Sequence, residues 1–136
     1  MTKKILLFLF SLSPVALFAQ SAFSDCEMVF KTVQHFPSLK ISTEAFEDTL
    51  LTELKSKKFP LKDNEIIYKF VVTTGSKIDE LTVDSGSVAR EKVLEEAILH
   101  FAELWKPATQ NGYEVCSYVK LKVQFVANKI SIEITQ

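Results

Sequence analysis

Apolar residues with helical spacing define the first element that the sequence predicts. Phe46, Leu50 and Leu54 follow one another at intervals of four residues, which places them on one face of a helix. Ser42 precedes this segment, and a serine side chain at that position can accept a hydrogen bond from a backbone N–H of the first turn. We therefore expect an amphipathic helix over residues 43–56.

A second helical pattern follows later in the chain. Gly86 lies before its start and Pro107 lies beyond its end, where each favours a break in the helix. The pattern predicts a helix over residues 88–104, with charged residues mostly on the opposite face. Its apolar row consists of Ala89, Val93, Ala97 and Phe101.

Two segments between these helices have the composition of β-strands. Residues 66–74 are rich in β-branched and aromatic residues, and residues 77–83 continue after a turn at Gly75-Ser76. The short turn makes the pair a β-hairpin. Ile78 is out of phase with the later apolar positions of its strand, which predicts a bulge or a late strand start.

The cleanest alternation in the chain follows the turn signal Asn111-Gly112. Over residues 113–125 one face of the predicted strand is expected to lie on the core, and the other to be partly solvated. Isoleucines alternate again over residues 130–134, which predicts a short last strand after a turn near Asn128. The core-facing positions of the long strand are Val115, Ser117, Val119, Leu121, Val123 and Phe125.

The order of these elements predicts an α+β domain over residues 42–136. Helix, strand, strand, helix and strand follow one another, with one more strand if the last isoleucines pair. We expect two helices packed on one face of a three- or four-stranded antiparallel sheet. Residues 20–41 are poorly periodic and contain Pro37, so they are interpreted as an N-terminal arm. Its short apolar segment, Met28, Val29, Phe30 and Val33, predicts either a strand or an arm packed on the core.

Residues 1–19 have the features of a secretory signal peptide. Lys3 and Lys4 supply a positive start, an apolar stretch follows, and Ala19 is a small residue at the expected cleavage junction. The apolar stretch is shorter than the about 20 residues that a membrane-spanning helix needs. We expect export to the periplasm with no stable membrane insertion after cleavage. The alternative is an uncleaved N-terminus that anchors the chain in the inner membrane.

The composition excludes several classes of function. The chain has 136 residues, a formal net charge of −1 and only 3 Gly. This charge offers no basic stripe for nucleic acid, and neither glycine-rich phosphate-binding motif occurs. His35 and His100 are the only histidines, and they belong to no metal-binding or catalytic motif. We therefore expect no enzymatic activity, no cofactor and no metal site.

Two cysteines, Cys26 and Cys116, remain after the predicted cleavage. An even pair in an exported protein favours one disulfide. That bond would close a loop of about 90 residues and stabilise the fold by about 4–5 kcal/mol in chain-entropy models. The alternative is two free or buried thiols.

The stretch after the second predicted helix resembles one protein family. A helix that ends in W-x-P-[AG], a loop with G-x-x-V and a strand that ends in an aromatic residue are together similar to the C-terminal domain of TonB, the energy-transducing protein of Gram-negative bacteria. The upstream hairpin and Phe59-Pro60 fit the same pattern. The residues that carry the resemblance are Trp105, Pro107, Ala108, Gly112, Val115 and Phe125.

The resemblance implies a protein-binding module linked to TonB-dependent outer-membrane transport. In that family an extended receptor segment pairs beside the last strand of the domain, so an outer-membrane receptor segment is the implied partner. The long proline-rich linker and the uncleaved membrane helix of TonB have no counterpart in this pattern, so force transduction is not implied. The implied partner-binding edge strand comprises Tyr113, Val115, Ser117, Val119, Leu121, Val123 and Phe125. If residues 130–134 form a further strand at that edge, that strand would either protect the edge or be displaced by the partner.

Two other classes of function remain open from the sequence. The chain could be a structural or assembly protein of the envelope that has the same fold without a transport role. Exposed strand edges would then allow a homodimer. A small secreted enzyme or inhibitor is the third class, although no constellation of catalytic residues supports it.

Overall fold

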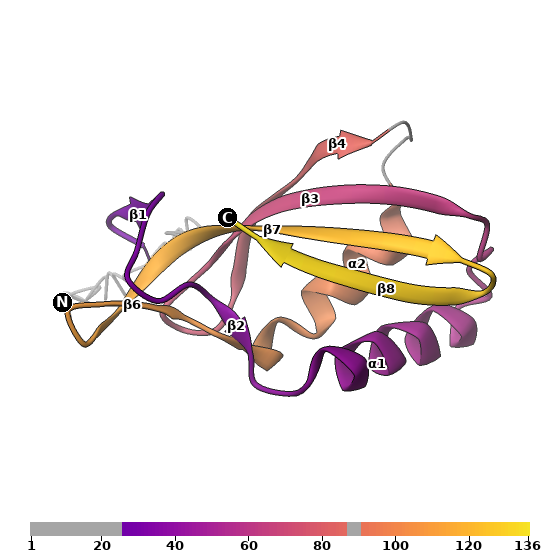
Figure 1. Cartoon of the computed structure of the whole chain (residues 1–136), viewed down its shortest axis with the longest axis horizontal. Helices are drawn as coiled ribbons and strands as arrows, with labels where there is room; N and C mark the ends of the chain where they lie inside the picture. The colour runs from indigo at the N-terminus through magenta and orange to yellow at the C-terminus, as the bar shows by residue number, and fades with distance from the viewer. Residues whose placement is uncertain (1–25, 87–90) are drawn as a thin grey trace, which may run out of the picture.

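The computed structural model describes residues 26–86 and 91–136 of the chain. The predicted signal peptide, residues 1–19, and residues 20–25 of the predicted arm lie outside the described residues. Figure 1 shows two helices on the same side of a twisted sheet. In chain order the elements are β1 (Val29–Phe30), β2 (Ser38–Leu39), α1 (Thr43–Ser56), β3 (Asn64–Val72), β4 (Ile78–Gly86), α2 (Lys92–His100), the 3-10 helix η1 (Ala102–Leu104), β5 (Trp105–Lys106), β6 (Ala108–Gln110), β7 (Tyr113–Val126) and β8 (Lys129–Thr135).

Helix α1 has the bounds that its sequence predicts. The hydroxyl of Ser42 accepts a hydrogen bond from Ala45 N at 3.1 Å, which satisfies one N–H group of the first turn. Phe46, Leu50 and Leu54 are fully buried. Burial of such side chains stabilises the fold by about 1.5–3 kcal/mol each, so this apolar row fixes α1 to the sheet.

Helix α2 is shorter than predicted. It covers Lys92–His100, whereas the apolar pattern predicts residues 88–104, of which 88–90 lie outside the described residues. Glu91 has extended backbone angles and precedes the first helical residue. After Phe101 the chain tightens into η1, and this 3-10 turn redirects it into β5.

The prediction of a three- or four-stranded antiparallel sheet is wrong. The structure has a six-stranded mixed sheet, and β2 and β5 form a separate pair. β1 pairs with β7 in parallel. The segment with Val29 and Phe30, for which a strand is one of two alternatives, forms β1. β6 has three residues, too few for side-chain alternation to reveal a strand in the sequence. The six strands of the mixed sheet are β1, β3, β4, β6, β7 and β8.

Strand β7 runs through the middle of this sheet. Leu121 is paired with a residue of β3 and also with a residue of β8, so β3 and β8 lie on opposite sides of β7. Ser117 is paired with a residue of β3 and also with a residue of β1, so β1 too lies opposite β3. β1 and β8 therefore follow one another along the same side of β7.

Trp105 is fully buried in the core. Its ring packs edge-on against Phe46 of α1 and Phe70 of β3, with centroids 6.2 and 5.4 Å away. The indole Nε1 is buried and has no hydrogen-bond partner among the described residues. Packing against two aromatic rings therefore holds this side chain in place, and it joins α1 to the sheet.

Left-handed backbone angles mark the two-residue turns at both ends of β7. Asn111 (φ 52°) and Gly112 (φ 81°) connect β6 to β7, which confirms the predicted turn. Ala127 (φ 50°) and Asn128 (φ 62°) connect β7 to β8, which confirms the turn expected near Asn128. Glu80 (φ 55°) lies at a register shift between β3 and β4, which confirms the predicted bulge.

Candidate functional site

The predicted partner-binding strand forms, as β7, but it is not an edge strand. Its residues 120–126 pair with β8 on one side, and its residues 117–125 pair with β3 on the other. Tyr113 is 77% exposed and Val115 is half-buried. A partner strand cannot pair with β7 beside β8 while β8 stays in place. The remaining predicted binding residues are buried: Ser117, Val119, Leu121, Val123 and Phe125.

The outer edge of β8 is covered by helix α1. The backbone N–H of Ile132 donates a hydrogen bond of 3.0 Å to the carboxylate of Glu47. Ile130 and Ile132 are buried and belong to the hydrophobic core. Covering an edge strand with a helix is one of the ways in which natural proteins prevent unwanted strand pairing. The β8 edge is therefore protected.

The N-terminal arm covers the other end of β7 and the edge of β6. The disulfide between Cys26 and Cys116 is present, as predicted, and it ties the arm to β7. His35 and Thr109 of β6 exchange two backbone hydrogen bonds of 3.2 and 3.0 Å. The chain thus supplies its own additional strand along this part of the sheet.

β4 is the long strand with an unpaired outer edge. Among the described residues it pairs only with β3, and in Figure 1 it forms the margin of the sheet farthest from β8. Leu81 and Val83 are half-buried against the core, whereas Thr82 and Asp84 are exposed. This edge is therefore supported from one face and open along its length.

One hydrogen bond fixes the direction of the backbone groups across the sheet. The N–H of Ile132 points at Glu47 and therefore away from β7. Val123 of β7 is the residue paired with Ile132, so the N–H and C=O of Val123 also point away from β8, toward β3. Alternation along β3 then directs the N–H and C=O of Tyr68 toward β7. Val83 is the partner of Tyr68, and its N–H and C=O therefore lie on the open edge of β4.

Acidic side chains accompany this open edge. Asp79, Glu80 and Asp84 all belong to β4. Asp84 forms an ion pair of 3.1 Å with Lys120 of β7. Glu80 accepts a hydrogen bond of 3.2 Å from the hydroxyl of Tyr118, and the charge of Glu80, this hydrogen bond and desolvation raise the pKa of Tyr118. Charges on an edge strand oppose its pairing with a second copy of itself.

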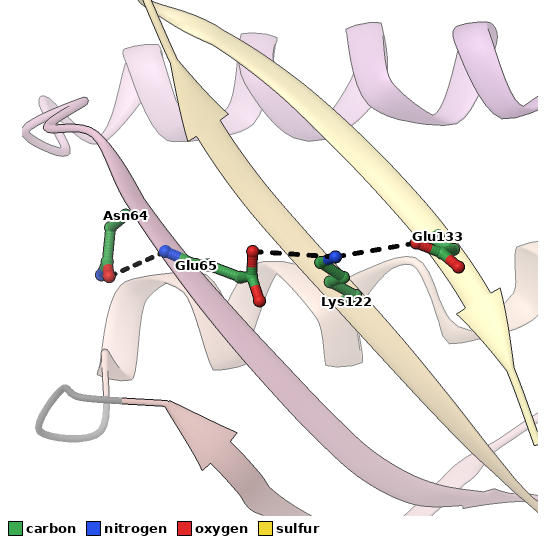
Figure 2. A network of polar contacts seen from close by, with 4 residues as sticks. All are labelled: Asn64, Glu65, Lys122 and Glu133. Atoms are coloured by element: carbon green, nitrogen blue, oxygen red, sulfur yellow. Dashed lines mark hydrogen bonds and ion pairs between the residues drawn. The ribbon is translucent and has the colours of Figure 1, made fainter.

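The face of the sheet opposite the helices is polar. Figure 2 shows Lys122 of β7 between Glu65 of β3 and Glu133 of β8, with N–O distances of 3.7 and 3.8 Å. The side chain of Asn64 accepts a hydrogen bond of 2.8 Å from Glu65 N. Exposed ion pairs contribute about 0–1 kcal/mol each. We therefore interpret this face as a solvated surface whose charges are internally paired.

The residues that carry the family resemblance support the fold. Trp105, Pro107 and Ala108 are buried, and Gly112 has the left-handed conformation of a hairpin turn. Within residues 26–86 and 91–136 no group of three His, Cys, Asp or Glu side chains could hold a metal ion. No helix in this part of the chain is long and apolar enough to cross a membrane.

Sequence reasoning missed β4 as the open edge. The local signal was the alternation of half-buried Leu81 and Val83 with charged or polar neighbours, which is typical of an edge strand. That signal is ambiguous on its own, because a strand in the middle of a one-sided sheet alternates in the same way. Only the pairing of the other strands identifies the edge.

The chain was compared with protein families, curated proteins and solved structures. None of the three comparisons found a match. The resemblance to the TonB C-terminal domain therefore rests on the residues named above.

Proposed function

We propose that this chain is an exported protein-binding module that pairs with an extended segment of an envelope protein at the open edge of β4. The observation that carries the proposal is the unequal protection of the sheet edges. Glu47 and the disulfide-linked arm cover one side of the sheet, whereas no described residue pairs with the outer edge of β4. Backbone pairing at an open sheet edge is a recurrent mode of peptide recognition.

The chemistry of the edge selects the partner. Strand addition would pair the partner with the N–H and C=O of Val83, next to the exposed acids Glu80 and Asp84, which also contact Tyr118 and Lys120 of β7. We therefore expect an extended segment that carries Lys or Arg, because opposite charges across a strand pair are favourable. The disulfide supports an oxidising compartment such as the periplasm. The TonB resemblance makes periplasmic segments of outer-membrane receptors the first candidates.

The test is a titration of the disulfide-bonded chain with synthetic peptides that cover such receptor segments, each with a scrambled control, followed by amide NMR. Binding should shift the resonances of β4 and slow hydrogen exchange at Val83, because that N–H would gain an acceptor. Shifts confined to β8 or β1 would contradict the proposal. So would the absence of any binding across the whole peptide set.

Two variants separate backbone pairing from charge. Val83→Pro removes the N–H at the open edge without removing a donor to β3, and should abolish binding. Glu80→Lys keeps the backbone and reverses one exposed charge, so it should weaken binding of basic segments by about tenfold, or about 1.4 kcal/mol. Glu133→Lys reverses an exposed charge on β8, away from the proposed binding edge. This variant is the matched control and should bind normally. Equal losses in the two charge variants would contradict the proposed location.

A further inference from the structure

The N-terminal arm and the segment from β5 to β6 form an antiparallel ladder that is interrupted at two prolines. Leu39 pairs with Trp105 and Ser38 with Lys106, and His35 pairs with Thr109 in the same register. This register places Pro37 opposite Pro107. Proline has no N–H, so neither chain can donate a ladder hydrogen bond at this step. The two segments therefore pair on both sides of the prolines, and the prolines donate no backbone hydrogen bond between them.

A groove of about 640 Å³ lies at this interruption. The polar residues that line it include His35, Ser38, Lys106 and Thr109, and the apolar ones are Phe36 and Pro107. Within the part of the chain that the structure describes, no Asp or Glu lines it. The volume lies within the range of about 300–1,000 Å³ that is typical of small-molecule sites.

The donors of this groove are uncommitted. Among the described residues, the side chains of His35, Ser38 and Lys106 have no hydrogen-bond or ion-pair partner, whereas the side-chain amide of Gln34 is already bonded to Asn111. A Lys ammonium has three donors and no acceptor, and an imidazole or a hydroxyl can donate one hydrogen bond. The groove therefore offers positive charge and donors without a competing acid.

We propose that this groove is a binding site for a small carboxylate that has an apolar or aromatic body. Lys106 pairs with the carboxylate, hydroxyl or imidazole donors complete its hydrogen bonds, and the ring or chain of the ligand lies on Phe36 and Pro107. The site is independent of the β4 edge. It also differs from strand addition, because the two segments that form the groove already pair with each other on both sides of it.

The probe is N-benzoylglycine, with its uncharged amide as the matched ligand. The disulfide-bonded chain is titrated with each and followed by amide NMR. The carboxylate should shift the resonances of Ser38, Lys106 and Thr109 and bind at least about tenfold more tightly than the amide, because an ammonium–carboxylate hydrogen bond is charge-assisted. Equal affinity for the two ligands, or shifts confined to other surfaces, would overturn the proposal.

Substitution of the lysine locates the charge. Lys106 is exposed, so Lys106→Ala should leave the fold intact and remove the tenfold preference for the carboxylate. Lys129→Ala removes an exposed lysine from β8, outside the groove, and should keep the preference. A Lys106→Ala variant that still prefers the carboxylate tenfold would overturn the assignment of Lys106, and with it the proposed site.

Discussion

The two sides of the sheet are protected very differently. On the side of β8, a helix carboxylate covers the edge, and a disulfide holds the arm beside β7. On the side of β4, charged side chains and a bulge at Glu80 are the protection among the described residues. A covered edge is closed to every partner, whereas a charged edge is closed mainly to copies of itself.

This difference indicates at which strand a partner strand is expected to pair. The hydrophobic pattern alone favours β7, because β7 has the longest alternation in the chain. Pairing potential, however, depends on unpaired backbone groups, and β7 lies between β3 and β8 along most of its length. The strand with the weaker sequence pattern, β4, is therefore the one that pairs on one side only among the described residues. Substitutions on one side of the sheet can therefore be compared with the other side as the reference.

Removal of the disulfide should produce the largest effect. Cys26 and Cys116 are separated by 90 residues in sequence, so the bond constrains most of the unfolded chain. Cys26→Ala with Cys116→Ala should lower the free energy of unfolding by about 2–5 kcal/mol, measured in urea. Reduction of the wild-type protein should give the same free energy. An unchanged free energy would show that pairing alone holds the arm.

The same variant should open the protected side selectively. The arm buries Val33, and its pairing with β5, β6 and β7 covers only a few residues at each place, so loss of the disulfide should favour its detachment. Hydrogen exchange should accelerate at the backbone amides of His35 in the arm and Thr109 in β6, which are hydrogen-bonded to each other. It should change little for the amides that pair β3 with β4. Equal acceleration on both sides would mean that the two sides unfold as one cooperative unit.

Glu47→Ala should open the edge of β8. It removes the acceptor of the Ile132 N–H, and loss of a hydrogen bond to a charged group is expected to reduce the free energy of unfolding by about 1.5–3 kcal/mol. The freed edge should also increase self-association, measured by light scattering. Asp48→Ala, an exposed neighbour on α1, is the control and should change stability by less than about 0.5 kcal/mol. A monomeric, fully stable Glu47→Ala protein would remove the basis for calling the β8 edge protected.

A smaller and opposite effect is expected at the turn between β7 and β8. Ala127 has a φ of 50°, a conformation that costs an L-residue about 1–2 kcal/mol and glycine much less. After the greater entropy of glycine in the unfolded chain is subtracted, Ala127→Gly should raise the free energy of unfolding by about 0.5–1 kcal/mol. Asn128→Gly should raise the free energy of unfolding by a smaller amount, because asparagine tolerates this conformation. A destabilised Ala127→Gly variant would contradict the turn geometry.

Local features of the fold could be predicted from the sequence, because their causes are local. The serine cap and apolar row of α1 gave its bounds, and Asn111-Gly112 gave the turn before β7. The start of α2 and the three-residue strand β6 were not predicted, because a few residues carry too little periodicity. The buried indole N–H of Trp105, which has no hydrogen-bond partner among the described residues, could not be predicted either, since its surroundings depend on three separate elements.

The candidate site could not be predicted, because it depends on contacts between distant parts of the chain. The alternating isoleucines of β8 indicated a strand, but the residue that covers its edge, Glu47, is 85 positions away in sequence. Likewise, the groove is lined by residues of two distant segments, such as His35 and Lys106, and only the pairing of those segments brings them together. A pattern identifies which strands form, and the pairing decides which edge remains open.

Glu80→Gln changes a residue on the open side of the sheet and should leave the protected side unchanged. The negative charge of Glu80, and then its hydrogen bond, raise the pKa of Tyr118 above its ordinary value. Because the folded state holds this proton more tightly than the unfolded state, the resulting stabilisation is present below the ordinary tyrosine pKa and disappears as the pH rises through the raised one. Glu80→Gln should therefore lower the pKa of Tyr118, measured by tyrosinate absorbance. Asp84→Asn, which removes the acid paired with Lys120, is the control, and an equal shift in that variant would refute a specific contact between β4 and Tyr118.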